Sequence, residues 1–335
     1  MVANSFIYKA IVAKKIYHQD ILDEAEANRG GSEEGVIEVK NLTKNYGHGR
    51  GVFDVSFSVK KGEVFGFLGP NGAGKSTTMR HLMGFSKPQN GDCFINGMDC
   101  WANHAEIMKS VGYLPGEVAL PEGVSGKSFL DIMKKLRSSP DDRCQELLKT
   151  FEVTTAGSVK RMSIGEKRKL AVAAAFMGNP DVLLLDEPTS GLDPVMQEVF
   201  IEFIRGEKAK GKTILLSSHI FSEVEALCDR IAIIKDGKIV SVVSADEVKH
   251  YKRKTFVITF ADEKNYKKFV GEPFEFREIF PDEFKVEIAA DDSKCDGLVK
   301  ALTKYNVLNF VEHQQTLEEY FMNFYKSDKK FGGIK

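Results

Sequence analysis

Long apolar runs, net charge and paired cysteines are all scarce in this chain of 335 residues. Its apolar runs, such as 182–185 and 231–234, have the length of single strands, and none approaches the roughly 20 residues that a transmembrane helix requires. The sequence therefore predicts a chain that does not itself span a membrane. Lys9, Lys14 and Lys15 interrupt the aliphatic N-terminal stretch and no small-residue cleavage site follows, so we do not expect a secretory signal.

The charges are nearly balanced, with 47 Lys and Arg against 48 Asp and Glu and a net charge of -1. Without an overall field the chain has no general attraction for nucleic acid or for an acidic membrane, so any partner must be recognised locally and no nucleic acid is expected. The five cysteines are odd in number and scattered, which excludes both the close pairs of a zinc site and a disulfide framework. This usage is typical of the reducing cytoplasm.

Composition divides the chain into three parts. Residues 1–34 form a weakly amphipathic extension that ends in a Gly- and Ser-containing linker. Between 35 and 245, β-rich runs alternate with helical patterns, an order that usually builds a mainly parallel sheet covered on both faces. Over 250–328 the order becomes βαββαβ, which predicts a small ferredoxin-like α+β module. A length of 335 residues is typical of two folded domains.

The two terminal segments have less certain roles. For residues 1–34, a membrane-surface helix, a disordered tail and a misassigned start codon all stay open as interpretations. The last predicted helix carries Leu317, Tyr320, Phe321 and Phe324 at i, i+3, i+4 and i+7, which forms an apolar stripe that must dock on something. We expect this helix to close its own C-terminal module.

The strongest motif is the segment Gly69 to Ser76, with the sequence G-P-N-G-A-G-K-S. A predicted strand at 63–68 precedes it and a predicted helix at 77–83 follows, the order that a phosphate-binding P-loop requires. Its glycines let backbone N–H groups curl around phosphate oxygens, and the helix start adds about half a positive charge. We expect Lys75 to hold the β- and γ-phosphates and Ser76 to offer its hydroxyl to Mg²⁺.

Two further apolar strands deliver polar side chains to the end of a sheet. The strand 182–185 is followed by Asp186 and Glu187. We expect Asp186 in the Mg²⁺ shell, and Glu187 can orient or deprotonate a water aimed at the γ-phosphate. The strand at 214–216 leads to His219, which can reach phosphate from the same edge. A lone His is more often structural, so the order of the motifs is what favours a functional role.

With these motifs in this order, residues 36–243 resemble the nucleotide-binding domain of ABC transporters. The resemblance implies a P-loop NTPase fold with a mainly parallel sheet, an antiparallel β subdomain and a helical subdomain at about 112–165. It also implies that Tyr46 stacks on adenine. Ser163 and Gly165 occupy the signature loop, and the resemblance implies that they close over the γ-phosphate held by a second subunit.

The resemblance further implies an ATPase that uses ATP and Mg²⁺, forms a head-to-tail homodimer or heterodimer and drives separate integral membrane permease subunits from the cytoplasmic face of the cell membrane. Residues 316–322 resemble the ending of ABC-2 type exporter ATPases, so we expect export. The expected catalytic residues are Lys75, Glu187 and His219, the metal ligands Ser76 and Asp186, and the nucleotide-binding residues Tyr46, Gly69, Pro70, Asn71, Gly72, Ala73, Gly74, Lys75, Ser76, Thr77, Ser163, Gly165 and Asp193.

The chain departs from the family pattern at two positions. Gly116 stands where the family usually has Gln, so a side-chain amide to Mg²⁺ is missing, and Glu117 or a water molecule is the candidate to replace it. This change concerns how nucleotide state is signalled to the membrane partner rather than ATP binding. Ile164 replaces the first signature glycine, while Ser163 and Gly165 remain, so we expect activity to survive.

Two other functions compete with export. A soluble ABC ATPase that acts on ribosomes or nucleic acid is disfavoured, because the chain has one P-loop and no heptad run. A weakly hydrolytic regulatory subunit is suggested by Gly116 and Ile164. It ranks below export because Lys75, Glu187 and His219 are all present. The transported substance is not encoded in this chain, because specificity in such an assembly belongs to the permease.

Overall fold

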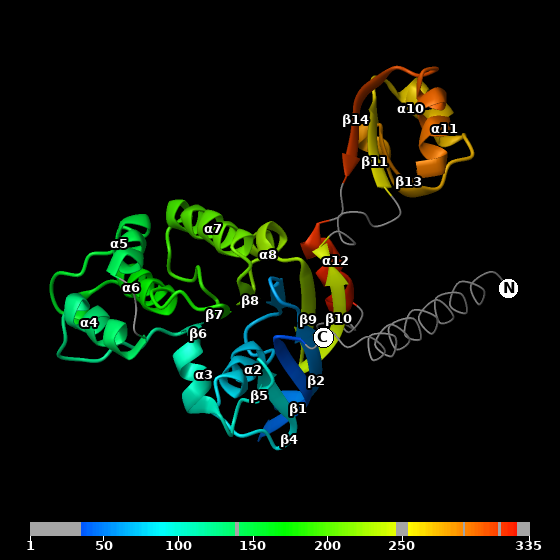
Figure 1. Ribbon diagram of the computed structural model, residues 1–335. Coiled ribbons are helices and arrows are strands. Elements are labelled where there is room, and N and C mark those ends of the chain that lie inside the picture. The colour runs from blue at the N-terminus through cyan, green and yellow to red at the C-terminus, as the bar shows by residue number, and fades with distance from the viewer. Residues whose placement is uncertain (1–34, 138–140, 246–253, 291, 314–315, 327–335) are drawn as a thin grey trace, which may run out of the picture. The chain divides into compact units, whose positions relative to one another are not determined.

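The computed structural model describes residues 35–137, 141–245, 254–290, 292–313 and 316–326 (Figure 1). The interpretations of residues 1–34, and the predicted packing of the Phe324 side chain, lie outside what is described. Within the described ranges, no helix combines the length and the apolar character needed to cross a bilayer.

A six-stranded sheet carries the motifs. Its order is β10 (Lys238–Ser244), β9 (Arg230–Lys235), β3 (Val64–Leu68), β8 (Thr213–Ser218), β7 (Val182–Asp186) and β6 (Val111–Leu114). All neighbours run parallel except β10, which pairs antiparallel with β9. Every residue of β3, β7 and β8 is buried, as expected for the strands of a parallel sheet covered on both faces. The predicted mainly parallel α/β sheet is therefore confirmed.

A second sheet is entirely antiparallel and packs against one face of the first. Its strands are β2 (Arg50–Val59), β1 (Ile37–Gly47), β4 (Asn90–Ile95) and β5 (Met98–Asp99), in that order. The Phe57 ring of β2 stacks on Phe65 of β3 with 5.3 Å between the ring centroids, which places aromatic area in the layer between the sheets. The helices α2 (Lys75–Leu82) and α3 (His104–Ser110) complete this core with Met79, Leu82 and Ile107.

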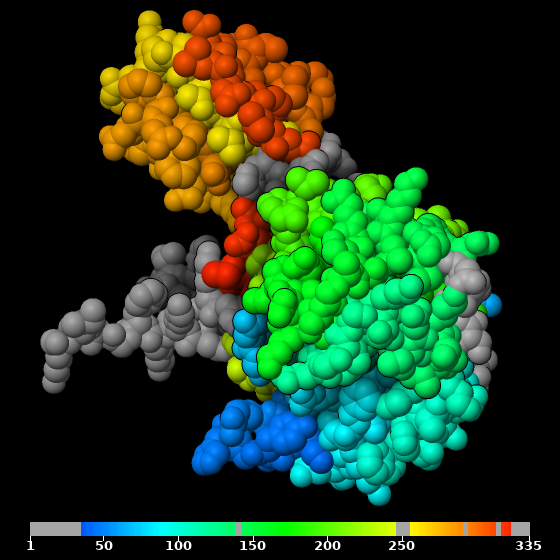
Figure 2. Space-filling model, turned by 90° about the vertical axis from the view of Figure 1, so that its left-hand side faces the viewer, coloured from blue at the N-terminus to red at the C-terminus, as the bar shows by residue number. Residues whose placement is uncertain are grey.

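The other face of the central sheet is covered by helices. These are α4 (Gly126–Arg137), α5 (Asp141–Thr150), α6 (Ile164–Phe176), α7 (Pro194–Ala209) and α8 (Phe221–Leu227), and Figure 2 shows this helical region in green. The start of α6 is set by a capping box, because Ser163 Oγ accepts from the Glu166 N–H at 3.2 Å and Glu166 Oε2 accepts from the Ser163 N–H at 2.8 Å. Both α4 and α5 contact α6, as the predicted helical subdomain requires.

The C-terminal module has its own core. Its elements are β11 (Lys254–Phe260), α10 (Glu263–Val270), β12 (Phe276–Phe280), β13 (Lys285–Ala290), α11 (Asp292–Leu302) and β14 (Val307–His313). The strands form an antiparallel sheet in the order β12-β13-β11-β14, and Phe260, Phe269 and Leu298 lie in the core between sheet and helices. This is the ferredoxin-like order predicted from the sequence.

The last helix, α12 (Leu317–Lys326), docks on α8 and the helical core of the central sheet rather than on the module that precedes it. The Leu317 side chain is fully buried in the core that contains α6 to α8, and its N–H donates to Glu225 Oε1 at 2.6 Å. The Phe321 ring meets Phe221 of α8 edge-on with 5.0 Å between centroids. The expectation that this helix closes its own module is therefore wrong. Helical spacing revealed an apolar stripe but carries no information about which surface receives it.

We expect Leu317→Ala to lower the free energy of unfolding of the domain that carries the central sheet by about 2–5 kcal/mol, because it leaves a cavity in that core. Met322→Ala on the exposed side of α12 is the matched control and should change this free energy little. Urea unfolding followed by fluorescence of the single tryptophan, Trp101, tests this, because Trp101 belongs to the same domain. Equal midpoints for the two variants would show that α12 does not contribute to this core.

Candidate nucleotide-binding site

The strand register brings the predicted site residues to one edge of the central sheet. Leu68 of β3 pairs with Ser218 of β8, and Asp186 of β7 pairs with Ser217 of the same strand. Because these strands are parallel, the segments that follow them leave from the same edge. The phosphate loop, the acid pair and His219 are therefore neighbours in space although about 150 positions separate the first from the last.

The phosphate loop requires glycine at its two ends. Gly74, the N-cap of α2, has a φ of 112°, in the left-handed region that residues with a Cβ rarely adopt. At Gly69 an added Cβ would lie 2.5 Å from the carbonyl oxygen of Ile234. The loop runs directly into α2, so the free N–H groups of the first helical turn lie at the loop. This backbone is suited to hold an anion such as a phosphate group.

The three predicted catalytic side chains lie together beside this loop. Lys75 is almost fully buried, and its Nζ donates to the carbonyls of Gly69 at 2.7 Å and Pro70 at 3.2 Å. The same Nζ lies 3.2 Å from Glu187 Oε1, while Glu187 Oε2 lies 3.3 Å from His219 Nδ1. Glu187 has a φ of 47°, a left-handed conformation where β7 ends, which is uncommon for a non-glycine residue and is often found at functional sites. The Glu187 carboxylate thus lies between the Lys75 ammonium and the His219 imidazole, which follows β8.

Asp186 and Ser76 provide oxygen donors at the same edge. Asp186 is buried and accepts a short hydrogen bond from Ser217 Oγ, whereas Ser76 is exposed in the first turn of α2. Mg²⁺ is usually held by one or two protein oxygens together with phosphate oxygens and water, so this pair fits a magnesium ion bound with a nucleotide. The described residues contain no cluster of three or more His, Cys, Asp or Glu able to hold a metal without such help.

The remaining predicted residues lie on neighbouring elements. Tyr46 is about half exposed at the end of β1. Its neighbour Asn45 pairs with Gly51 of β2, and a Cβ added at Gly74 of the phosphate loop would lie 3.2 Å from the Gly51 carbonyl oxygen. The β1–β2 hairpin therefore borders the phosphate loop. In the rest of that loop Pro70, Asn71 and Gly72 are exposed and Ala73 is buried, while Thr77 lies in the first turn of α2.

Ser163, Gly165 and Asp193 lie at helix starts. Ser163 caps α6, and Asp193 caps α7 by accepting from the Met196 N–H at 3.0 Å. At Gly165 an added Cβ would lie 3.0 Å from the Gly191 carbonyl oxygen, so the signature loop contacts the loop that leads to Asp193. Both caps have a structural role within the chain.

Two buried charged residues of this region were not predicted. The Arg168 guanidinium on α6 donates to carbonyl oxygens of the loops that follow β6 and β7. Glu223 on α8 is buried and accepts from Ser218 Oγ at 2.6 Å. Glu223 lies in the first turn of α8, which begins two residues after His219, and this closeness in sequence could have drawn attention to it. No sequence pattern identifies Arg168.

The pKa of Glu223 is raised to about 7, chiefly because burial disfavours its charged form. The hydrogen bond from Ser218 opposes this shift and the nearby charge of Glu187 adds to it. The group therefore titrates near neutral pH, next to the segment that leads to His219.

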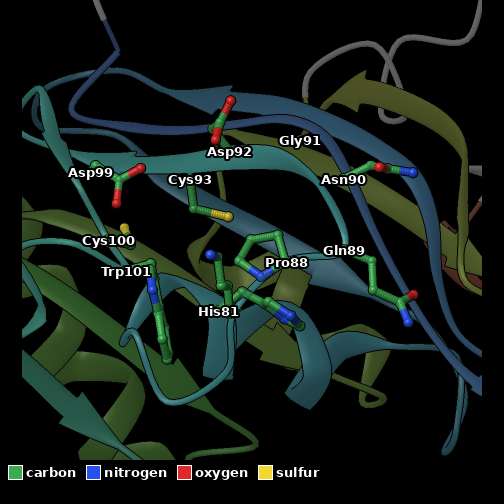
Figure 3. Close-up of a pocket in the computed structure, with 11 residues that line it drawn as sticks. His81, Pro88, Gln89, Asn90, Gly91, Asp92, Cys93, Asp99, Cys100 and Trp101 are labelled. Atoms are coloured by element: carbon green, nitrogen blue, oxygen red, sulfur yellow. The ribbon is translucent and has the colours of Figure 1, made fainter.

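A cavity with a volume of about 300 Å³ lies elsewhere on the domain that carries the central sheet, and Figure 3 shows the residues that line it. It is lined by His81, in the last turn of α2, and by residues 87–93 and 99–101. The phosphate loop precedes the opposite end of α2, and none of the predicted site residues lines the cavity. It is therefore a feature separate from the candidate site.

A glycine-rich loop between a buried strand and a helix, with an acid pair on the adjacent sheet edge, defines a P-loop ATPase fold. Comparisons with known proteins identify the family within this class. A family model described as "ABC transporter" matches residues 52–190. The chain is 30% identical over 295 residues to the bacitracin transport ATP-binding protein BcrA of Bacillus licheniformis, covering 86% of this chain and 96% of that protein. It therefore belongs to the family of ABC transporter ATP-binding proteins, as its motifs predicted.

Two further similarities agree with this family. The chain is 35% identical over 233 residues to the doxorubicin resistance ATP-binding protein DrrA of Mycobacterium tuberculosis, covering 67% of this chain and 70% of that protein. A solved structure described as an ATP binding subunit of an ABC transporter superposes with a TM-score of 0.60 at 30% identity, covering 64% of this chain and 92% of that one.

We expect Glu223→Gln to gain stability relative to the wild type as the pH rises from about 5 to 8. The folded-state pKa of Glu223 lies above its ordinary value of 4.5, so the fold binds more protons than the unfolded chain in this window and wild-type stability falls as pH rises. The neutral amide removes this loss, on the order of a few kcal/mol.

Urea unfolding at several pH values, followed by Trp101 fluorescence, measures the effect. Glu202→Gln, which removes an exposed carboxylate from α7, is the control for loss of one charge. A constant difference between Glu223→Gln and the wild type across the pH range would contradict the prediction.

Proposed function

We propose that this chain is the ATP-hydrolysing subunit of an ABC exporter, that it dimerises when ATP binds and that it drives separate permease subunits in the membrane. The observation that carries the proposal is the position of Glu187. Its carboxylate lies within 3.3 Å of both Lys75 and His219 at the edge of the phosphate loop. A carboxylate in this place is suited to orient or deprotonate a water molecule.

The chain's own groups supply most of what phosphoryl transfer needs. The N–H groups of the phosphate loop and the Lys75 ammonium bind the negative phosphate oxygens. Ser76 and Asp186 would hold Mg²⁺, whose charge neutralises those oxygens. Glu187 positions the attacking water and His219 holds the opposite carboxylate oxygen or the γ-phosphate in place. Positioning and electrostatics account for most of the catalysis in such sites.

Surface features support a second subunit over the signature loop. Ser163 is exposed, Ile164 is 76% exposed, and Val195, which follows the cap residue Asp193, is 73% exposed. Large apolar side chains exposed to this extent at adjoining loops are typical of surfaces that a partner covers. In the proposed dimer, Ser163 and Gly165 of one chain face the phosphate loop of the other.

The proposal of export rests on relatives. BcrA is named for bacitracin transport and DrrA for doxorubicin resistance. The described chain has no helix able to cross a bilayer, so transport by this chain would need an integral membrane partner. We place it accordingly at the inner face of the cell membrane.

Replacing Glu187 with Gln tests the chemistry. Because the amide cannot accept the proton of water, we expect ATP turnover to fall by roughly 100-fold or more while ATP affinity stays within about threefold. Phosphate release and binding of a fluorescent ATP analogue measure the two quantities. Glu202→Gln should behave as the wild type, and turnover at the wild-type rate by Glu187→Gln would make the proposed mechanism wrong.

Isolation of the affinity-tagged chain from cells tests the partner. We expect it to copurify with detergent-solubilised membranes and with a protein that contains several apolar segments of about 20 residues. Mass spectrometry of the purified complex identifies that protein. Recovery with ribosomes in place of such a protein would favour the soluble ABC ATPase function instead.

A further inference from the structure

We propose that Arg168 is a positioning residue for ATP hydrolysis, which holds the two loops that border Asp186 and Glu187 in one fixed arrangement. The inference rests on the proposed function, because it concerns how the same site is kept in its working geometry.

The contacts of Arg168 are divided between two loops. Its Nη1 donates to the Pro115 carbonyl at 2.8 Å and its Nη2 makes a short hydrogen bond to the Gly116 carbonyl, both in the loop after β6. Its Nε donates to the Ser190 carbonyl at 3.0 Å, in the loop after β7. A planar guanidinium with donors in a fixed fork thus determines the distance between two loops that are otherwise separate in sequence.

Each loop is in direct contact with one of the two acids. The backbone of Gly116 lies against Asp186, since an added Cβ at Gly116 would be 3.1 Å from Asp186 Oδ2. The Ser190 N–H donates to the Glu187 carbonyl at 3.1 Å. Arg168 is therefore linked to Asp186 through Gly116 in one loop and to Glu187 through Ser190 in the other.

The buried position of Arg168 makes these hydrogen bonds costly to lose. The residue is 4% exposed, and a shorter or neutral side chain would leave partly buried carbonyl oxygens without this donor. Burial lowers the pKa of the Arg168 guanidinium, and the charges of Asp186 and Glu187 counteract this. The positive charge is thus held where two carboxylates are close.

Arg168 also connects the site to the signature loop. It lies on α6, about one and a half turns after Ser163, so a rigid shift of this helix moves the guanidinium and both loops with it. Residue 116 has no side chain, and its link to α6 runs through its backbone carbonyl. A movement of the surface around Ser163 and Ile164 would in this way reach Asp186 and Glu187.

The test compares Arg168→Met and Arg168→Lys with the wild type of the full chain. We expect ATP affinity to stay within about threefold, because neither side chain touches the phosphate loop, and kcat to fall about tenfold or more in Arg168→Met. Arg168→Lys should recover part of kcat, since an ammonium can donate to some but not all three carbonyls. Hydrogen exchange of the amides at 116–117 and 189–192 should become faster in both variants.

Arg205→Met is the matched control, because Arg205 is an exposed arginine on α7 that pairs with Glu202. The number of ATP sites per chain, titrated with the fluorescent analogue, separates positioning from misfolding. A folding defect lowers this number together with kcat, whereas a positioning defect lowers kcat alone. If Arg168→Met does not fold, Arg168→Lys decides the question by the same measurements.

Wild-type kcat and unchanged hydrogen exchange at both loops in the folded variants would overturn the role of Arg168. Failure of the proposed function gives a different result. In that case the wild type itself has no turnover, or Glu187→Gln retains full turnover, whatever the Arg168 variants do.

Discussion

The parallel alignment of β3, β6, β7 and β8 is the constraint on which the rest of the site depends. Because these strands share one direction and register, the segments that follow them leave from a single edge of the sheet. Glu187 can then lie within 3.3 Å of Lys75, which follows β3, and of His219, which follows β8. A slip of one residue in β7 would exchange the faces of Asp186 and its neighbours and separate these groups.

Buried polar groups hold the loops of this edge against one another. Arg168 joins the loops after β6 and β7, and Glu223 on α8 holds the end of β8 through Ser218. Apolar packing alone would place the sheet and the helices but leave the loops free to shift. Directional hydrogen bonds in a low dielectric restrict them to one arrangement, which a site with such short distances requires.

The C-terminal helix α12 packs against the helical layer that supports the candidate site. Its contacts are with α8 and β10, and α8 begins two residues after His219 and carries Glu223. The Phe321 and Phe221 rings meet edge-on at this contact. The helix α12 is thus part of the core that includes α8, the helix that follows His219. The stability of that core therefore depends on residues near the end of the described chain.

Local patterns determined the phosphate loop, the acid pair, the alternation of strands and helices and the βαββαβ order of the C-terminal module. Each of these features is encoded by residues that are neighbours in sequence. Gly69 to Ser76, for example, predict a phosphate loop without reference to any residue distant in sequence. Only the tertiary structure decided where α12 docks, which carbonyls Arg168 bonds and why Glu223 titrates near neutral pH. These properties arise between residues distant in sequence, and their energies come from burial and hydrogen-bond geometry that no local pattern encodes.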